Sequence, residues 1–257
     1  MRIVSLVPSL TLTAFELGIN EHQMVGRTAW CIHPKENVEN IKIVGGTKTP
    51  KLRNIIDLNP DLVLMDKEEN PLDTYNKLKD KGFSVYVSSV RSLHEVPQML
   101  ESLGEACHKL ENGKKMSENC IQVINTIRKK KKNRKNTLRV LPLIWHNPLM
   151  SVSSKRYAGS LLQYAGFDVV DINQDVGYPE VSISEIVKNN IEILLLSSEP
   201  HQFTIDEGNK IANMVEKSGG IRPKTCLIDG EKLTWFGSKT SSSLMHFFEL
   251  HDQLIKE

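Results

Sequence analysis

Three histidines of the sequence, His33, His146 and His201, are candidates for metal binding or acid–base chemistry. An imidazole ligates transition metals when neutral and can carry a proton near neutral pH. None of the three has a second histidine three or four residues away, which is the helical spacing of a preformed metal site. Types and spacing therefore leave two readings open, a ligand-binding role and an ordinary structural one.

Charged residues follow one apolar run and are partly repeated after a second. In "PDLVLMDKEEN", Pro60 to Asn70, the apolar residues end in Asp66, Lys67, Glu68, Glu69 and Asn70. The segment "IEILLLSSEP", Ile191 to Pro200, has the same form, and a shift of 131 positions places Asp61 on Glu192 and Glu68 on Glu199. Such carboxylates either face a ligand or are solvated loop residues.

Large aromatic residues also follow expected strands. The three tryptophans, Trp30, Trp145 and Trp235, lie in the segments "TAWCIHP", "IWHNP" and "TWFGSKT". In parallel α/β sheets, ligands bind beyond the carboxyl ends of the strands. A single tryptophan there is often a packing residue, but three at equivalent places indicate a binding surface that also includes Glu199 and His201.

Signatures of common enzyme classes are missing from the sequence. It has no GxSxG, no GxxxxGK[ST] and no GxGxxG after the first expected strand; "VGGTKT", Val44 to Thr49, lacks the phosphate-loop spacing. Aromatic and charged residues without a catalytic constellation favour binding over turnover. We therefore predict a protein that is not an enzyme and that needs no cofactor beyond its ligand.

Composition restricts the partners and the compartment. A net charge of +2 in 257 residues argues against nucleic acid, and the basic run Arg128 to Lys135 is typical of a solvated helix end. No apolar run is long enough to span a membrane. The four scattered cysteines predict free thiols. Without a secretory leader before the first strand, the sequence predicts a cytoplasmic protein, or a periplasmic or extracellular one if the chain is a mature form.

Strand-like and helix-like segments alternate along the chain, which predicts an α/β fold with mainly parallel sheets. Expected strands are 2–7, 23–28, 61–66, 83–88, 138–145, 168–172, 192–198 and 225–229. Expected helices include 9–18, with Ser9 as N-cap, and 51–60, 74–82, 156–166, 183–190 and 205–220. The order of elements is similar in both halves, so we expect two Rossmann-like lobes.

The segment between the halves has the pattern of one long helix. From Lys114 onward, Met116, Cys120, Val123, Ile124 and Ile127 recur at spacings of three and four. A helix from about Asn112 to Asn133 would be roughly 33 Å long. We therefore predict an N-terminal lobe at 1–108, a rigid connecting backbone helix within 109–136 and a C-terminal lobe at 137–257.

Three segments together resemble the helical-backbone metal receptor family of ABC-transporter solute-binding proteins: "RIVSLVPSLTLTAFELGINEHQMVGRT", "VGGTKTPKLRNIIDLNPDLVLMDKEEN" and "TWFGSKT". The resemblance covers almost the whole chain. It implies two α/β lobes joined by a long helix, with a metal chelate such as cobalamin, haem or a ferric siderophore held between them. It also implies a monomer and a transporter permease as partner.

Three positions depart from the resemblance. Transporter-docking members carry a glutamate in each lobe where this chain has Arg53 and Ser184, the latter next to Glu185. Arginine would repel the basic sockets that such glutamates pair with. Asp66 stands where the cobalamin binder has an aromatic residue, which indicates a more polar ligand. Trp30 keeps one aromatic wall, and Tyr178 could supply the other.

These observations predict a solute-binding protein for a metal chelate. Its aromatic contacts would be Trp30, Trp145, Tyr178 and Trp235, and its polar contacts Asp66, Lys67, Glu68, Glu69, Asn70, Glu199 and His201. His33 or His146 would ligate an open metal position. The alternative is a cytoplasmic protein on the same scaffold that handles a cofactor or metal, or a metal-dependent enzyme using the histidines and glutamates.

Overall fold

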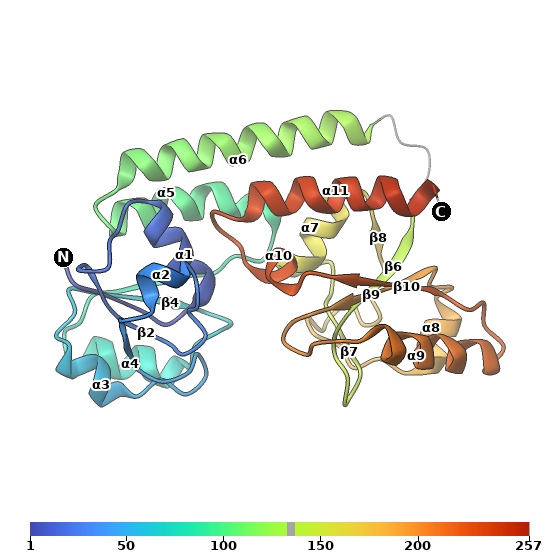
Figure 1. The fold of residues 1–257 in the computed structure, drawn as a ribbon, viewed down its shortest axis with the longest axis horizontal. Helices are drawn as coiled ribbons and strands as arrows, with labels where there is room; N and C mark the ends of the chain where they lie inside the picture. Colours follow the sequence, from blue (N-terminus) through green and yellow to red (C-terminus); the bar gives the residue numbers. More distant parts are fainter. Residues whose placement is uncertain (133–136, 257) are drawn as a thin grey trace. The chain divides into compact units, whose positions relative to one another are not determined.

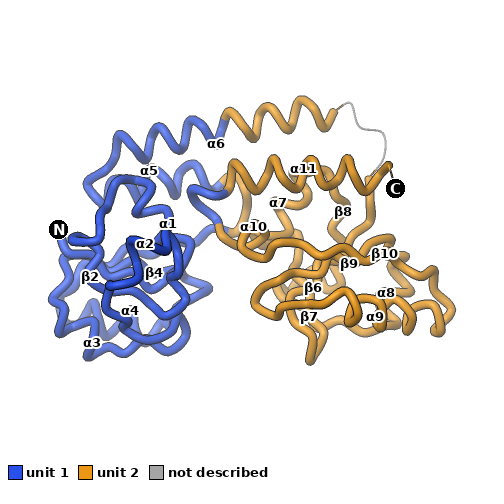
Figure 2. Tube along the Cα trace, viewed as in Figure 1, with its two compact units in different colours: residues 1–90, 95–121, 236–239 blue, residues 91–94, 122–235, 240–257 orange. Residues whose placement is uncertain are grey.

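The computed structural model describes residues 1–132 and 137–256, and its chain divides into two compact units (Figures 1 and 2). Unit 1 contains residues 1–90, 95–121 and 236–239, and unit 2 contains 91–94, 122–235 and 240–257. The division differs from the predicted lobes at two short segments. Residues 91–94 belong to unit 2 although unit 1 flanks them in sequence, and residues 236–239 belong to unit 1 although unit 2 flanks them. It also falls inside a helix, so no loop marks the boundary. No helix within the described residues has the length and apolar character needed to cross a bilayer.

Unit 1 is a five-stranded parallel sheet of order β3-β2-β1-β4-β5. Its strands are β1 Ile3–Ser5, β2 Met24–Arg27, β3 Lys42–Ile43, β4 Leu62–Asp66 and β5 Val85–Ser88. Its helices are α1 Pro8–Glu16, α2 Lys35–Val38, α3 Leu52–Asp57, α4 Leu72–Asp80 and α5 Val96–Ala106. Apolar residues of α3 and α4 pack with those of β1 and β4 in one buried cluster. Strands β1 and β4 are buried at every residue, as expected for strands at the centre of a sheet that helices cover.

Unit 2 contains a second five-stranded sheet with β6 at its centre. Strands β6 Arg139–Trp145, β8 Asp168–Val169, β9 Ile193–Ser197 and β10 Lys224–Ile228 are parallel, whereas β7 Met150–Ser151 runs antiparallel to β6. The helices are α7 Tyr157–Ala165, α8 Ile183–Lys188, α9 Ile205–Lys217, α10 Gly230–Thr234 and α11 Thr240–Lys256. Figure 1 shows α7 and α11 on one face of the sheet and α8 and α9 on the other. The predicted α/β class with mainly parallel sheets is confirmed.

The predicted long helix is α6, Leu110–Lys131, and it runs from unit 1 into unit 2. The expected end at Asn133, the last part of the basic run and the lobe boundary at 136 lie outside the described residues. In unit 1 this helix approaches α5 closely at two glycines. A Cβ atom on Gly113 would lie 2.7 Å from the carbonyl oxygen of Leu100 and 3.1 Å from the Cα atom of Gly104, so only glycine fits there.

Helix α1 begins differently from the prediction. Its N-cap is Val7, which offers no side-chain hydrogen bond, and Pro8 occupies the first turn, so the expected Ser9 cap is wrong. Proline is favoured in a first turn because its missing N–H would have no partner there. Gly18, at φ 97°, ends the helix as the sequence predicts.

The repeat seen in the sequence corresponds to a repeated helix–strand pair. An offset of 131 residues places α3 on α8 and β4 on β9, residue for residue at both ends of each element. The turns between them match as well, since Asn59 and Asn190 both have positive φ, 43° and 48°. The similarity therefore includes backbone conformation and is not confined to charge pattern.

In unit 1, one arginine side chain and its backbone connect this helix to this strand. The Arg2 guanidinium donates to the carbonyl oxygen of Leu58 at 2.8 Å (Nη2) and 3.1 Å (Nε), at the end of α3. The backbone N–H of Arg2 donates to Asp61 Oδ2 at 2.6 Å, and the N–H of Asp61 donates to the carbonyl of Arg2. One residue thus binds a helix end and the start of the neighbouring strand.

Unit 2 has the same arrangement around Arg139. Its guanidinium donates to the carbonyl oxygen of Asn189 at 3.0 and 3.2 Å, and its backbone N–H donates to Glu192 Oε2 at 2.6 Å. Arg139 also forms an ion pair with Asp168 at 3.1 Å. Asp61 and Glu192, which the sequence comparison paired, therefore have one structural role at the start of a buried strand.

Candidate ligand-binding site

Trp30 is presented by the turn that follows β2. Its side chain is strongly exposed, at 66%. The next residue, Cys31, is fully buried, and its sulfur lies 3.1 Å from the Thr28 hydroxyl oxygen. Because Cys31 anchors the turn inward, the indole beside it faces outward, where it neighbours Gly46. His33, further along the same segment, is half-buried.

The charged end of β4 is organised by Asp66, which is 3% exposed. Its Oδ1 accepts the backbone N–H groups of Glu68 at 2.8 Å and Glu69 at 3.2 Å, and its Oδ2 accepts the Ser88 hydroxyl at 2.6 Å. Burial raises the pKa of the Asp66 carboxyl above its usual value, against the opposing effect of these hydrogen bonds. Asp66 therefore holds the turn in place.

Asn70 completes the same turn. Its Oδ1 accepts the backbone N–H of Asp66 at 2.8 Å, and its Nδ2 donates to the carbonyl oxygens of Leu6 at 3.2 Å and Thr47 at 3.0 Å. At 8% exposure it is buried. Asp66 and Asn70 were expected to contact ligand, and that remains a prediction; in the structure their polar atoms form hydrogen bonds within and around the turn.

The remaining charged residues of this turn are accessible. Lys67 is exposed, and Glu68 and Glu69 are half-buried. Lys48, which sequence reasoning missed, donates to the backbone carbonyl of Glu68 and lies 4.0 Å from Glu69 Oε2. Burial raises the pKa of the Glu69 carboxyl, and Lys48 opposes that shift. Unit 1 thus offers carboxylates and two lysines beyond the end of β4.

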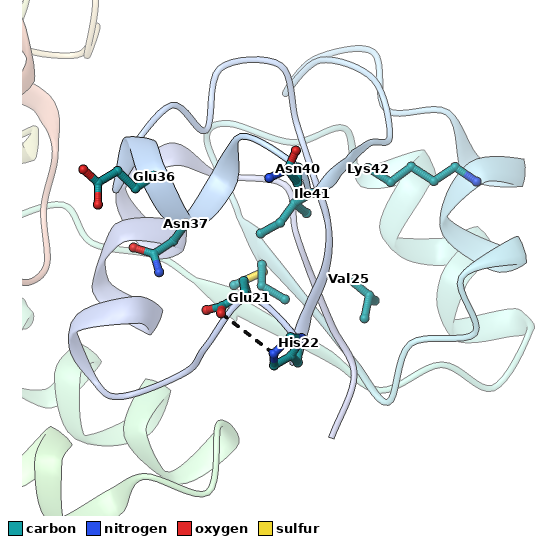
Figure 3. Close-up of a pocket in the computed structure, with 9 residues that line it drawn as sticks. Glu21, His22, Val25, Glu36, Asn37, Asn40, Ile41 and Lys42 are labelled. Atoms are coloured by element: carbon teal, nitrogen blue, oxygen red, sulfur yellow. Dashed lines mark ion pairs between the residues drawn. The ribbon is translucent and has the colours of Figure 1, made fainter.

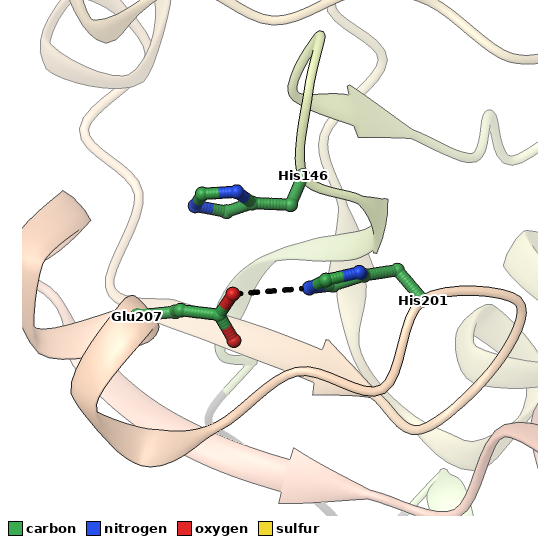
Figure 4. A group of neighbouring side chains, drawn as sticks. All are labelled: His146, His201 and Glu207. Atoms are coloured by element: carbon green, nitrogen blue, oxygen red, sulfur yellow. Dashed lines mark hydrogen bonds and ion pairs between the residues drawn. The ribbon is translucent and has the colours of Figure 1, made fainter.

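In unit 2, Trp145 is the last residue of β6 and His146 the first residue beyond it. Trp145 is 41% exposed, and its Nε1 donates to the carbonyl oxygen of Asn147 at 3.0 Å. The imidazole of His146 is stacked on that of His201, with centroids 5.5 Å apart and planes at 20° (Figure 4). Ends of β6 and β9 therefore bring residues 55 positions apart into contact.

His201 is fixed by several neighbours. Its Nε2 lies 3.1 Å from Glu207 Oε1, and its ring meets the buried Phe203 edge to face at 4.7 Å. Phe203 also contacts His146, at 5.9 Å between centroids. Glu207 belongs to the capping box of α9: its Oε2 accepts the Thr204 N–H at 2.7 Å and hydroxyl at 2.9 Å. These bonds from Thr204, together with His201, lower the pKa of Glu207 to about 2.

Three further candidates of unit 2 have different environments. Glu199 is half-buried, and its N–H donates to Ser197 Oγ at 3.3 Å, which repeats the role of Asp66 at the matching position. Tyr178 is 42% exposed, with the Arg156 guanidinium 5.5 Å from its ring centroid. Trp235 is 7% exposed. Its predicted role as a ligand wall stays a prediction, and the buried side chain packs within the protein.

The two positions at which the resemblance implies docking glutamates lie on matching helices. Arg53 is exposed on α3, and Ser184 is exposed on α8. Glu185, which was noted as a neighbouring substitute, forms a capping box in which its Oε2 accepts the N–H and hydroxyl of Ser182, both at 2.7 Å. Those bonds lower its pKa. The Glu185 carboxylate thus caps the first turn of α8.

A separate cavity of about 590 Å³ lies in unit 1 at the amino end of β2 (Figure 3). It is lined by Glu21, His22, Met24, Val25, Glu36, Asn37, Asn40, Ile41 and Lys42. Two of its lining residues, Glu21 and His22, are exposed neighbours whose carboxylate and imidazole lie 3.9 Å apart. Ligands of parallel sheets bind at the opposite, carboxyl end of the strands, so this cavity is not the candidate site.

Lys48, Phe203 and Glu207 were not among the residues predicted from sequence. A signal for Glu207 was present, because Thr204 followed three residues later by glutamate is a capping-box pattern that fixes a carboxylate at a helix start. Six residues separate it from His201, which is not a helical spacing, so only the turn between β9 and α9 brings the two side chains together.

Comparison with known proteins gives a consistent result. A family profile described as periplasmic binding protein matches residues 3–217. The vitamin B12-binding protein of Vibrio parahaemolyticus is 26% identical over 196 residues, which is 76% of this chain and 70% of that one. Among solved structures, the periplasmic vitamin B12-binding protein of Vibrio cholerae matches with a TM-score of 0.81 at 20% identity, covering 100% of this chain and 98% of that one. The periplasmic heme-binding protein of Roseiflexus sp. RS-1 matches with a TM-score of 0.80 at 19% identity, covering 96% and 98%.

Proposed function

The chain belongs to the periplasmic binding protein family, and from this premise we propose that it is a solute-binding protein whose ligand is a metal chelate. The observation that carries the proposal is the family match, which extends over residues 3–217. Two relatives compared above are described as binding vitamin B12 and heme, both planar macrocycles around a metal. The ligand class is therefore a corrinoid, a haem or a ferric siderophore.

The geometry supports this function at the strand ends of each unit. Trp30 and Trp145 are exposed aromatic residues at or just beyond a strand end, and Tyr178 is exposed in the connection between β8 and α8. A flat macrocycle stacks well on such rings. Lys67, Glu68, Glu69 and Glu199 supply charges for the polar periphery of a chelate. His33 or His146 ligates an open position of the bound metal in this proposal.

Titration of tryptophan fluorescence tests the proposal. Purified protein is titrated with cobalamin, cobinamide, haemin and ferric siderophores, with an inner-filter control because these ligands absorb light. Saturable quenching by one class at a stoichiometry near one is expected. No saturable response to any of the four would contradict the proposal.

Variants locate the binding surface within each unit. Trp30→Ala and Trp145→Ala are expected to weaken binding of the ligand that responds, because each removes an exposed ring. Trp235→Phe is the matched control, since that residue is buried and its replacement leaves the exposed surface unchanged. Equal affinity in Trp30→Ala, Trp145→Ala and the wild type would remove these residues from the site.

The proposal also covers partners, chemistry and location. The protein binds without turnover, has no resident cofactor apart from its ligand, acts as a monomer and delivers the ligand to an ABC transporter permease. The solved relatives are described as periplasmic, which favours a site of action outside the cytoplasm over the cytoplasmic one that the sequence suggested. Arg53, in place of a docking glutamate, predicts that Arg53→Glu strengthens binding to a permease with basic sockets.

A further inference from the structure

We propose that His146, His201 and Glu207 form a binding site for a free divalent transition-metal ion. One possible ligand atom from each residue lies within 4.8 Å of the other two (Figure 4). All three residues belong to unit 2, so the site needs nothing from unit 1. It shares His146 with the proposed chelate site but differs from the proposed function in its ligand, which is a free metal ion and not a chelate.

Glu207 supplies a carboxylate that is already oriented by hydrogen bonds within the first turn of α9. The bonds from Thr204 occupy Oε2 and turn Oε1 toward His201. This second hydrogen-bonding layer is the arrangement that orients ligands in known metal sites.

The two imidazoles are held by a shared packing partner. Phe203 is 4% exposed and contacts both rings edge to face. The backbone of His201 is fixed as well, since its N–H donates to the carbonyl oxygen of Ile144 at 3.3 Å. His201 Nε2 and Glu207 Oε1 are therefore 3.1 Å apart in a fixed geometry.

His146 must move to complete the site. Ligands about 2.0–2.2 Å from one metal ion lie roughly 3–3.5 Å from each other, which is less than the 4.8 Å limit of this cluster. Its ring, now 20° from parallel to that of His201, has to tilt toward the ion. Because His146 is exposed in the turn between β6 and β7, a change of side-chain rotamer achieves this without disturbing the core.

The donor set selects the class of ion. Two imidazole nitrogens and one carboxylate oxygen suit Zn²⁺, Co²⁺, Ni²⁺ or Cu²⁺, whereas Mg²⁺ and Ca²⁺ prefer oxygen ligands throughout. Three protein ligands leave a coordination position open. The site is therefore expected to hold its ion with water as the additional ligand.

The test uses untagged full-length protein freed of metal with a chelator. Co²⁺ is added and visible absorption is followed, and Zn²⁺ is then used to displace it. Saturable binding of one Co²⁺ per chain is expected, with displacement by Zn²⁺ and no displacement by Mg²⁺. The absence of saturable binding to the wild type would overturn the proposal.

Variants distinguish this site from scattered surface histidines. His146→Ala is expected to lower Co²⁺ affinity by more than about tenfold, since loss of even a second-layer partner costs that much. Because His146 is exposed, the variant is expected to fold normally, which circular dichroism checks. His22→Ala is the control for an exposed histidine in unit 1 and is expected to bind as the wild type does. Equal affinity in all three proteins would overturn the proposal.

Chelate titrations with the same proteins separate the two proposals. Metal binding without chelate binding would support the ion site and contradict the proposed function. Chelate binding by a protein that takes up no Co²⁺ would support the proposed function and overturn the ion site.

Discussion

Substitutions of Asp66 test whether this residue at the charged end of β4 stabilises the fold of unit 1 through its hydrogen bonds. We predict that Asp66→Ala destabilises unit 1 and that Asp66→Asn does not. The alanine variant removes the acceptor of the Ser88 hydroxyl, which is 2% exposed, and of the N–H groups of Glu68 and Glu69. A buried donor without a partner costs about 1–3 kcal/mol, and the two half-buried amides recover water in part, so the expected cost is about 2–4 kcal/mol.

Asparagine preserves the network. Its oxygen accepts the two amides, and its NH₂ group donates to Ser88, whose hydroxyl can donate to the Met65 carbonyl oxygen 3.4 Å away. It also removes a buried charge. We therefore expect the free energy of unfolding of unit 1 to stay within about 1 kcal/mol of wild type.

The pH dependence follows from the raised pKa of Asp66. The folded chain holds this proton more tightly than the unfolded chain, whose value is near 3.8. The resulting stabilisation of the wild type is complete below that value and is lost as pH rises through the folded-state pKa. Asp66→Asn lacks this loss, so its stability relative to wild type should improve between acidic and neutral pH.

Hydrogen exchange of the β4 amides measures the opening of unit 1 separately from unit 2, which a single unfolding curve would mix. The amides of Glu68 and Glu69 report the turn itself. Equal destabilisation by alanine and asparagine would refute the hydrogen-bonding account and assign the effect to the charge.

Three further predictions concern the stability of the helices and strands of the two units. Arg139→Met should lower the stability of unit 2 by about 1–3 kcal/mol, and Arg2→Met should lower that of unit 1 by less, because Arg139 has an additional ion pair. Hydrogen-exchange rates of the β9 and β4 amides measure the two losses, and a larger loss from Arg2→Met would contradict this ranking. Gly113→Ala should cost about 1–3 kcal/mol because its Cβ would meet the Leu100 carbonyl, and unchanged protection of α5 and α6 would count against that contact. Glu185→Gln should destabilise α8 at neutral pH, and this effect should disappear as pH falls from the unfolded-state value of 4.5 through the lower folded-state pKa. A pH-independent effect measured by exchange in α8 would exclude the ionised cap.

Much of the fold could be predicted because its central strands are apolar runs between turn signals. The expected segments 61–66 and 192–198 enclose β4 and β9. Helices α5 and α11 were not predicted as separate elements, and the antiparallel β7 was missed because a two-residue strand has no periodicity.

The site was predicted less fully because the sequence shows where charged residues lie along the chain but not whether their side chains face solvent or the interior. Asp66, Asn70 and Trp235 have residue types suited to ligand contact, yet each is buried, and the hydrogen bonds of Asp66 and Asn70 come from tertiary partners. His201 was predicted as a strand-end site residue and is half-buried there, but its pairing with Glu207 depends on the path of a turn.

The constant offset between α3–β4 and α8–β9 has an evolutionary consequence. A half-length gene that duplicated and fused would leave this pattern, with one arginine closing the helix–strand pair in each copy. After duplication, the two copies of a strand end are free to diverge separately. Asn70 and His201 occupy the same position of the repeat, and one is consumed by its turn while the other is available for chemistry. A repeated scaffold of this kind lets one copy carry a histidine at a position where the other copy needs an asparagine for its turn.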